Sequence, residues 1–309
     1  MRSLIPNKTI AKLVKWAVVG VGSIVILAFI GIGVLYMVSN NRMNRSFSVP
    51  SHAVPVRWDS VAIAHGRRLS KIRGCVDCHG EHMAGKVVID VPIVAQLYAS
   101  NLTSGKGGIG AHYTDMDWER AIRHAVDPEG KPLLFMPAQE FYYLSDQDVA
   151  ALIAYIKSLP PVDNELPVST VGPIGRLLYL RGEMPLVPAE LTDHNGEHPP
   201  APEPGITVSY GWYLSTGCAG CHRQDFSGGT IPGAPPDWPP APDLTPAGNL
   251  RNWSEQDFIR AMRTGIKPDG ARFRPPMPYQ ALSALTDEEL KAIWLFLQSL
   301  PPSKRESNP

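Results

Sequence analysis

The sequence predicts an all-α protein in which one N-terminal transmembrane helix precedes two tandem copies of a small helical domain. Three features predict this architecture: a long uncharged stretch near the N-terminus, a set of motifs that occurs twice in the same order, and apolar residues at helical spacing. The chain has 309 residues, of which 44% are hydrophobic, so packed cores are expected. Lys and Arg equal Asp and Glu at 29 each, which argues against the concentrated basic face of a nucleic-acid-binding protein.

The predicted transmembrane segment runs from Trp16 to Val38, where 23 consecutive residues carry no charge. A helix of about 20 residues spans the hydrocarbon core of a bilayer. By the positive-inside rule, residues 1–38 form a cytoplasmic N-terminus and a single-pass anchor, and the rest of the chain lies on the outer face. The basic residues that set this direction are Arg2, Lys8, Lys12 and Lys15 before the stretch, against Arg42 and Arg45 after it.

A cleaved signal peptide is the alternative interpretation of this stretch. The apolar region of a signal peptide usually has about 7–15 residues and ends in a cleavage site made of small residues. The stretch here is longer, and the sequence Tyr36–Asn40 does not resemble such a site. We therefore expect the segment to be retained as an anchor.

Internal repetition dominates the rest of the chain. The sequence Gly74–His79 recurs as Gly217–His222, 143 residues later, and four further motifs recur at offsets of 140 to 142 residues. This repetition predicts two domains of one type, residues 56–160 and residues 206–302. The further pairs are Asn101–Thr103 with Asp243–Thr245, Tyr113–Trp118 with Trp253–Phe258, Met136–Pro137 with Met277–Pro278, and Leu144–Asp146 with Leu285–Asp287.

Segments without a periodic pattern connect and flank these domains. Residues 39–55 are predicted to form a tether to the anchor, and the proline-rich residues 161–205 an extended linker. Residues 303–309 form a short tail. Within the domains, residues 80–112 and 223–252 are rich in Gly and Pro and are predicted to be loops.

Each domain is predicted to have a short first helix, a central helix and a final helix. Thr114-x-x-Asp117 and Ser254-x-x-Asp257 match the capping-box pattern, with Asp in the usual Glu position, and begin the central helices. Both final helices should end at Leu-Pro-Pro, because proline cannot continue a helix. The first helices contain Gly66 and Gly211, which would permit another helix to cross closely.

All four cysteines lie in two Cys-x-x-Cys-His motifs, the attachment signature of c-type haem. The two thiols bond the haem vinyl groups, and the histidine binds the iron. A dithiol redox pair would not require the histidine, and a four-cysteine zinc site would leave both histidines unexplained. The sequence therefore predicts two haem c groups, held by Cys75, Cys78 and His79 in the first domain and by Cys218, Cys221 and His222 in the second.

Met136 and Met277 are predicted to be the sixth ligands of the two irons. Met136 follows His79 by 57 residues, and Met277 follows His222 by 55, each in a proline-containing turn before the final helix. A thioether ligand raises the haem potential. With both axial positions filled, the iron suits electron transfer rather than oxygen or peroxide chemistry.

Other methionines and histidines are predicted to have no role at the haems. Met262 should be a core residue, Met116 should be exposed, and Met83 is too close to His79 to reach the opposite haem face. His124, the rival iron ligand in the first domain, is predicted to face solvent. The remaining histidines are predicted to be surface or loop residues: His52, His65, His82, His112, His194 and His198.

Together, the two Cys-x-x-Cys-His motifs, the Asn/Asp-Leu-Thr turn, the Met-Pro turn and the final helix ending at Leu-Pro resemble the class I cytochromes c. They are most similar to the cytochrome c subunits of membrane-bound bacterial alcohol and gluconate dehydrogenases. The resemblance covers about residues 56–160 and 206–302. It implies a respiratory electron carrier in the periplasm, anchored to the cytoplasmic membrane, between a dehydrogenase or quinol-oxidising complex and a terminal oxidase or soluble cytochrome.

Two alternatives accompany this interpretation. A di-haem redox enzyme, such as a peroxidase, would need one haem with an open or displaceable sixth position. A structural subunit of a respiratory complex would use the same haems to relay electrons internally. In the preferred interpretation the chain has no substrate chemistry of its own.

Overall fold

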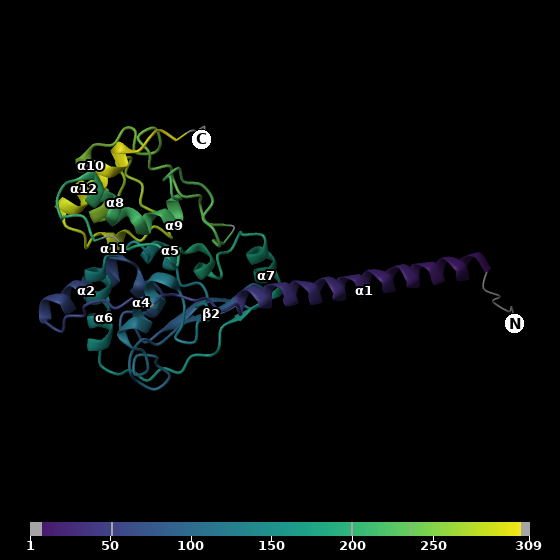
Figure 1. Cartoon of the computed structure of the whole chain (residues 1–309). Helices are drawn as coiled ribbons and strands as arrows, with labels where there is room; N and C mark the ends of the chain where they lie inside the picture. Colours follow the sequence, from purple (N-terminus) through teal and green to yellow (C-terminus); the bar gives the residue numbers. More distant parts are fainter. Residues whose placement is uncertain (1–7, 51, 199, 236, 304–309) are drawn as a thin grey trace.

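A computed structural model describes residues 8–50, 52–198, 200–235 and 237–303. Helix α1 (Lys8–Met43) projects from the rest of the molecule, and the two helical domains lie beside one another at its C-terminal end (Figure 1). The 18-residue apolar window of α1 has no buried residues, and its mean hydropathy is 2.7, so the helix is long and apolar enough to cross a membrane. The predicted tail beyond Ser303 and the charge of Arg2 lie outside the described residues.

The two domains have the same order of helices, as the repeat predicts. The first domain contains α2 (Ser60–Ile72), α3 (Cys75–His79), α4 (Asp115–His124), α5 (Ala138–Phe141) and α6 (Asp146–Ser158). The second contains α8 (Val208–Ser215), η2 (Thr216–Cys218), α9 (Ala219–His222), α10 (Glu255–Thr264), α11 (Tyr279–Leu282) and α12 (Asp287–Ser299).

The helix boundaries follow from local sequence chemistry. The predicted capping boxes are present at Thr114 and Ser254, where each hydroxyl accepts from the backbone N–H of an Asp three residues later and that Asp accepts in return. The final helices α6 and α12 end at Ser158 and Ser299, just before Leu-Pro-Pro. These predictions are confirmed.

The first and final helices of each domain cross in direct contact. A Cβ atom added to Gly66 would lie 1.9 Å from the carbonyl oxygen of Ala151 on α6. The equivalent atom on Gly211 would lie 2.0 Å from the carbonyl oxygen of Ala292 on α12. Only glycine fits at these crossings, as the sequence predicted.

A small sheet in the first domain was not predicted. Strands β1 (Lys86–Val91) and β2 (Ala95–Ala99) form an antiparallel hairpin, and β3 (Thr170–Val171) adds to β2. Residues 86–91 are a nearly continuous apolar run with little burial on either face, so no alternating pattern marks the strand.

The prediction of an extended linker at residues 161–205 is wrong. After β3 the segment folds into α7 (Pro173–Leu180) and the 3₁₀ helix η1 (Pro188–Leu191). Two of its prolines, Pro173 and Pro188, begin these helices, because the first turn of a helix needs no proline N–H. Apolar side chains of the segment bury against β2 in a separate small core that includes Ala95, Leu97, Met184, Leu186 and Val187.

The tether prediction also requires correction. Helix α1 continues to Met43, five residues beyond the predicted end of the anchor, and Met43 is buried in the same small core. The Arg176 guanidinium bonds Ser39 Oγ and Asn40 Oδ1, each at 2.7 Å. Arg42 pairs with Glu190, and the N–H of Phe47 donates to the carbonyl of Gly130 at 2.8 Å. The anchor is therefore fixed to the first domain.

We predict that Gly66→Ala destabilises the protein by about 1–3 kcal/mol, because the added methyl group overpacks the crossing of α2 and α6. Intrinsic helix propensity alone would stabilise by up to about 1 kcal/mol, so the sign of the change is diagnostic. Thermal unfolding of the haem-loaded protein measures it. Arg67→Ala, at the exposed neighbouring position, is the control, and a Gly66→Ala melting temperature at or above that of the wild type would contradict the prediction.

Candidate functional site

The two Cys-x-x-Cys-His motifs adopt nearly the same backbone path. The first forms the short helix α3, and the second spans η2 and α9. The residue after each histidine has a positive φ, 77° at Gly80 and 68° at Arg223, with ψ near 165° at both. All four cysteines are partly buried free thiols in the structure.

The motif histidines have the same orienting hydrogen bond. His79 Nδ1 lies 2.8 Å from the carbonyl oxygen of Ser100, and His222 Nδ1 lies 2.9 Å from that of Pro242. A carbonyl only accepts, so each ring carries its proton on Nδ1 and leaves the Nε2 lone pair available for a metal. Burial lowers the pKa of both histidines, which favours the neutral imidazole that binds iron.

The predicted methionine ligands also occupy equivalent turns. The carbonyl of Met136 accepts from the N–H of Ala138 at 2.7 Å, and that of Met277 accepts from the N–H of Tyr279 at 3.0 Å. Met136 packs against the same core as Cys75, and Met277 packs against the same core as Cys218. The structure thus brings each methionine to the core that its own attachment motif contacts.

These donors fit haem c better than the competing sites. Burial raises the pKa of Cys75 to about 12 and that of Cys218 to about 11. Burial therefore favours the protonated thiol, which is less reactive than the thiolate of a dithiol redox pair. A histidine with a free Nε2 next to a thiol pair, repeated in two matching turns, is the arrangement that covalent haem attachment requires.

Arg73 joins the two attachment motifs, and sequence reasoning did not identify it. It stands two residues before Cys75, and its buried side chain enters the second domain. There Nη1 donates to Thr216 Oγ1 at 3.0 Å, and Nη2 donates to the carbonyl of Tyr213 at 3.2 Å. Thr216 stands two residues before Cys218, so equivalent positions of the two copies meet. The only sign of this contact in the sequence is that Arg73 and Thr216 occupy equivalent positions, each two residues before the first cysteine of its motif.

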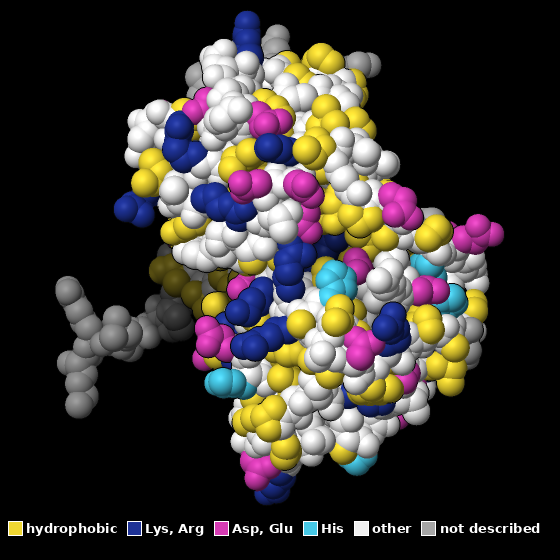
Figure 2. Space-filling view, turned by 90° about the vertical axis from the view of Figure 1, so that its left-hand side faces the viewer, with side chains coloured by type: hydrophobic (Ala, Val, Ile, Leu, Met, Phe, Trp, Pro, Cys, Tyr) yellow, Lys and Arg dark blue, Asp and Glu magenta, His cyan; other side chains and the backbone are white. Residues whose placement is uncertain are grey.

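Two further side chains, Tyr213 and Glu140, lie at the boundary between the domains and contact the other domain. Tyr213 of the second domain is 4% exposed within the core of the first, and its hydroxyl accepts from the N–H of Ser145 at 3.0 Å. Glu140 on α5 lies against Gly220 of the second attachment motif, and burial raises its pKa to about 7. On the face shown in Figure 2, basic and acidic side chains are interspersed, and Arg68 pairs with Glu289 across the same boundary.

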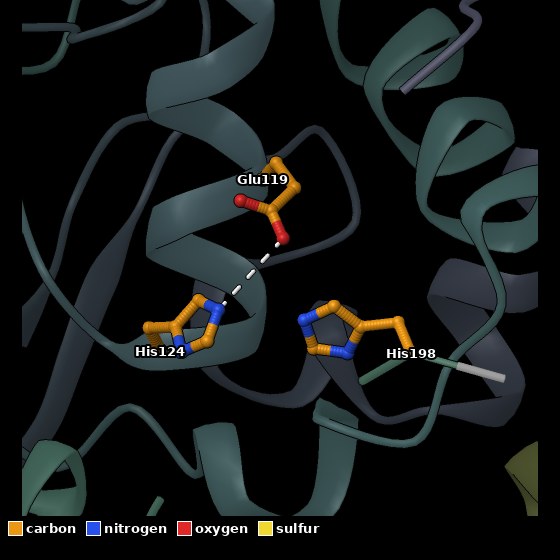
Figure 3. A group of neighbouring side chains, drawn as sticks. All are labelled: Glu119, His124 and His198. Carbon is orange, nitrogen blue, oxygen red and sulfur yellow. Dashed lines mark ion pairs between the residues drawn. The ribbon is translucent and has the colours of Figure 1, made fainter. Parts of the chain in front are cut away.

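The structure contradicts the prediction that His124 faces solvent. His124 is 2% exposed at the end of α4, and its Nδ1 lies 3.0 Å from Nδ1 of His194. His198 packs against it with ring centroids 5.6 Å apart (Figure 3). The folded segment 161–198 covers α4, and the prediction of an extended linker did not anticipate this cover.

The expectations for Met262 (buried), Met116 (exposed) and the exposed His82 and His112 are confirmed.

Comparison with known proteins agrees with the duplicated construction. The cytochrome c family model matches residues 63–160 and again residues 211–301, which together make up more than half of the chain. The two matches coincide with the two helical domains and contain both Cys-x-x-Cys-His motifs. These matches, together with the similarity to a diheme cytochrome c-type protein of Cereibacter sphaeroides, support two haem c groups, one in each domain.

Similar proteins include subunits of dehydrogenases. The cytochrome c subunit of the quinone alcohol dehydrogenase of Gluconacetobacter polyoxogenes is 31% identical over 280 residues, covering 79% of this chain and 57% of that protein. The fructose dehydrogenase cytochrome subunit of Gluconobacter japonicus is 28% identical, covering 84% and 56%. The diheme cytochrome c-type protein of Cereibacter sphaeroides is 27% identical, covering 77% and 86%. The chain thus spans little more than half the length of the two dehydrogenase subunits.

We predict that Met136→His and Met277→His each remove the weak thioether–iron absorption of one haem and lower the potential of that haem. The imidazole that replaces the thioether is the stronger donor to Fe(III), and the other haem keeps its methionine. Absorption spectra and a redox titration of each variant measure both effects. Met116→His, at an exposed position, is the control and should leave both haems unchanged. An unaltered spectrum for either test variant would remove that methionine from the ligand set.

Proposed function

Because this chain belongs to the cytochrome c family, we propose that it is an electron-transfer subunit that relays single electrons between two haem c groups held beside a membrane. Its donor would be a membrane dehydrogenase or a quinol-oxidising complex, and its acceptor a terminal oxidase or a soluble cytochrome. The similarity to subunits of alcohol and fructose dehydrogenases supports a dehydrogenase partner. The chain itself would contribute no catalytic residues.

The observation that carries the proposal is the matched construction of the two sites. Both motif histidines have an Nδ1–carbonyl bond, and in both methionine turns the methionine carbonyl accepts from the N–H two residues later. A peroxidase needs one iron with a displaceable sixth ligand, so its two sites should differ at that position. Equal sites support a relay rather than substrate chemistry.

In this proposal the residues of the chain hold the haems and set their environment. Cys75, Cys78, Cys218 and Cys221 would bond the two porphyrins, and the iron would supply the one-electron redox change. His79 and His222 would each hold a proton on Nδ1, bonded to a backbone carbonyl, so that Nε2 faces the metal. The surrounding cores exclude water from one side of each site.

The proposed placement is the outer face of the bacterial cytoplasmic membrane, with the N-terminus in the cytoplasm. The excess of basic residues before the apolar stretch supports this direction. The fixed joint between α1 and the first domain would keep both haem domains close to the bilayer.

Protease treatment of intact spheroplasts tests the placement and the haem number together. We expect the protease to release soluble fragments that stain for haem and whose masses account for two haem groups, while a tag ahead of Lys8 stays protected. Haem fragments that appear only after lysis would place the domains inside. One haem addition, or none, would contradict the relay.

The contact of Arg73 with the second domain predicts an effect on electron exchange between the haems. We expect Arg73→Ala to slow the internal equilibration after one haem is reduced, because the variant removes three interdomain hydrogen bonds, to Leu214, Thr216 and Tyr213. Rapid-mixing or flash-reduction kinetics measure the rate. Arg67→Ala, which removes an equal charge from the exposed side of α2, is the control. Equal rates in both variants would show that Arg73 does not couple the domains.

A further inference from the structure

A buried group of one carboxylate and two imidazoles lies at the end of α4, outside both attachment motifs. It contains Glu119, His124 and His198, and one ligand atom from each lies within 4.8 Å of the others (Figure 3). Glu119 is 1% exposed and His124 is 2% exposed. His198 comes from the segment between η1 and the second domain, so the group joins two distant parts of the chain.

Both imidazoles are held through Nδ1, and His124 leaves Nε2 free when its Nδ1 is the donor to His194. His198 Nδ1 lies 3.2 Å from the carbonyl oxygen of Tyr142, so it donates there and Nε2 keeps a lone pair. His124 Nδ1 lies 3.0 Å from Nδ1 of His194, and its Nε2 lies 3.8 Å from Glu119 Oε1. Figure 3 shows both rings directed into the space next to the Glu119 carboxylate. Histidines that bind metals use their other ring nitrogen in this way.

The electrostatic balance at the group favours a cation. Arg123 is the cation that contacts the group, and it divides its guanidinium between Glu119 at 3.2 Å and Asp146 at 2.8 Å. Two carboxylates therefore face one guanidinium, and His52 Nε2 also lies 3.0 Å from Asp146. Arg120, farther out on α4, pairs with Asp117 at 3.7 Å.

We propose that Glu119, His124 and His198 bind a divalent transition-metal ion such as Zn²⁺, separate from the haem irons. Two imidazoles and one carboxylate are a donor set that zinc uses, with bonds of about 2.0–2.2 Å. The ligand atoms would have to approach one another by roughly 1 Å to reach tetrahedral spacing. Arg123 and His124 both lie nearest Oε1 of Glu119, and a carboxylate offers about four lone-pair positions, so the ion would share this carboxylate with Arg123.

The ion would attach the connecting segment to the first domain. His198 lies just beyond the folded part of that segment, and His124 and Glu119 lie on α4. Binding would therefore stabilise the path of the chain from the first domain to the second. His194 would be a positioning residue that holds the His124 ring through Nδ1.

Zinc binding to the untagged, haem-loaded full chain in detergent tests the proposal. After treatment with a chelator, titration with Zn²⁺ alone should show one tight site per chain. His198→Ala should weaken it by roughly 100-fold or more, and His194→Ala by roughly 10-fold. Zinc-edge X-ray absorption should show nitrogen and oxygen neighbours at about 2.0–2.1 Å, including imidazole.

His82→Ala and His112→Ala are matched controls because both histidines are exposed and lie outside the group. They should bind Zn²⁺ as the wild type does. The haem spectrum and melting temperature of each chelated variant establish that it is folded. If the wild type binds no zinc tightly, or if folded His198→Ala binds it equally well, the group is a polar cluster neutralised by Arg123 and the proposal fails.

Discussion

Each domain depends on the contact between its first and last helices, which approach so closely that a backbone carbonyl occupies the space a side chain would need. At Gly66 the carbonyl of Ala151 fills that space, and at Gly211 the carbonyl of Ala292 does so. The attachment motif begins within a few residues of the end of the first helix, and the methionine turn precedes the last helix. The crossing therefore sets the positions from which the histidine and the methionine extend, so that both domains can present equivalent donor sets.

The interface between the domains places the two attachment turns next to each other. Arg73 bonds residues just ahead of Cys218, Tyr213 lies in the core of the first domain, and Glu140 packs against the second motif. All three side chains are buried or partly buried. Arg73 and Tyr213 also form hydrogen bonds across the interface, so the two domains are held in one fixed arrangement. An electron relay needs a fixed arrangement of its domains, because the rate of electron exchange between haems depends steeply on their separation.

The sequence was sufficient for those features that repeat or that rest on local chemistry. Capping residues, helix-ending prolines, the two glycines and the paired motifs each have a local physical cause, and the structure contains them all. Strand β1 was not predicted because residues 86–91 bury neither face and so show no alternation. Strand β2 does alternate, with Ala95 and Leu97 buried, but the pattern covers only five residues. The folded segment 161–198 was not predicted because Pro173 and Pro188 occupy helix starts, a role that composition alone does not distinguish from polyproline. The burial of His124 follows from that segment, so it could not be inferred before the segment's path was known.

The joint between α1 and the first domain has a mechanical consequence. Hydrogen bonds from Arg176 to Ser39 and Asn40, the pairing of Arg42 with Glu190 and the burial of Met43 leave no free hinge at the base of the helix. With α1 inserted in a bilayer, any tilt of the helix would also tilt the two haem domains, because the base of the helix is bonded to the first domain. The unit would then diffuse in two dimensions at a fixed height and a fixed orientation. Such a carrier can dock only with partners whose own redox centres face it at that height, so the joint would select partners by geometry before any surface contact is made.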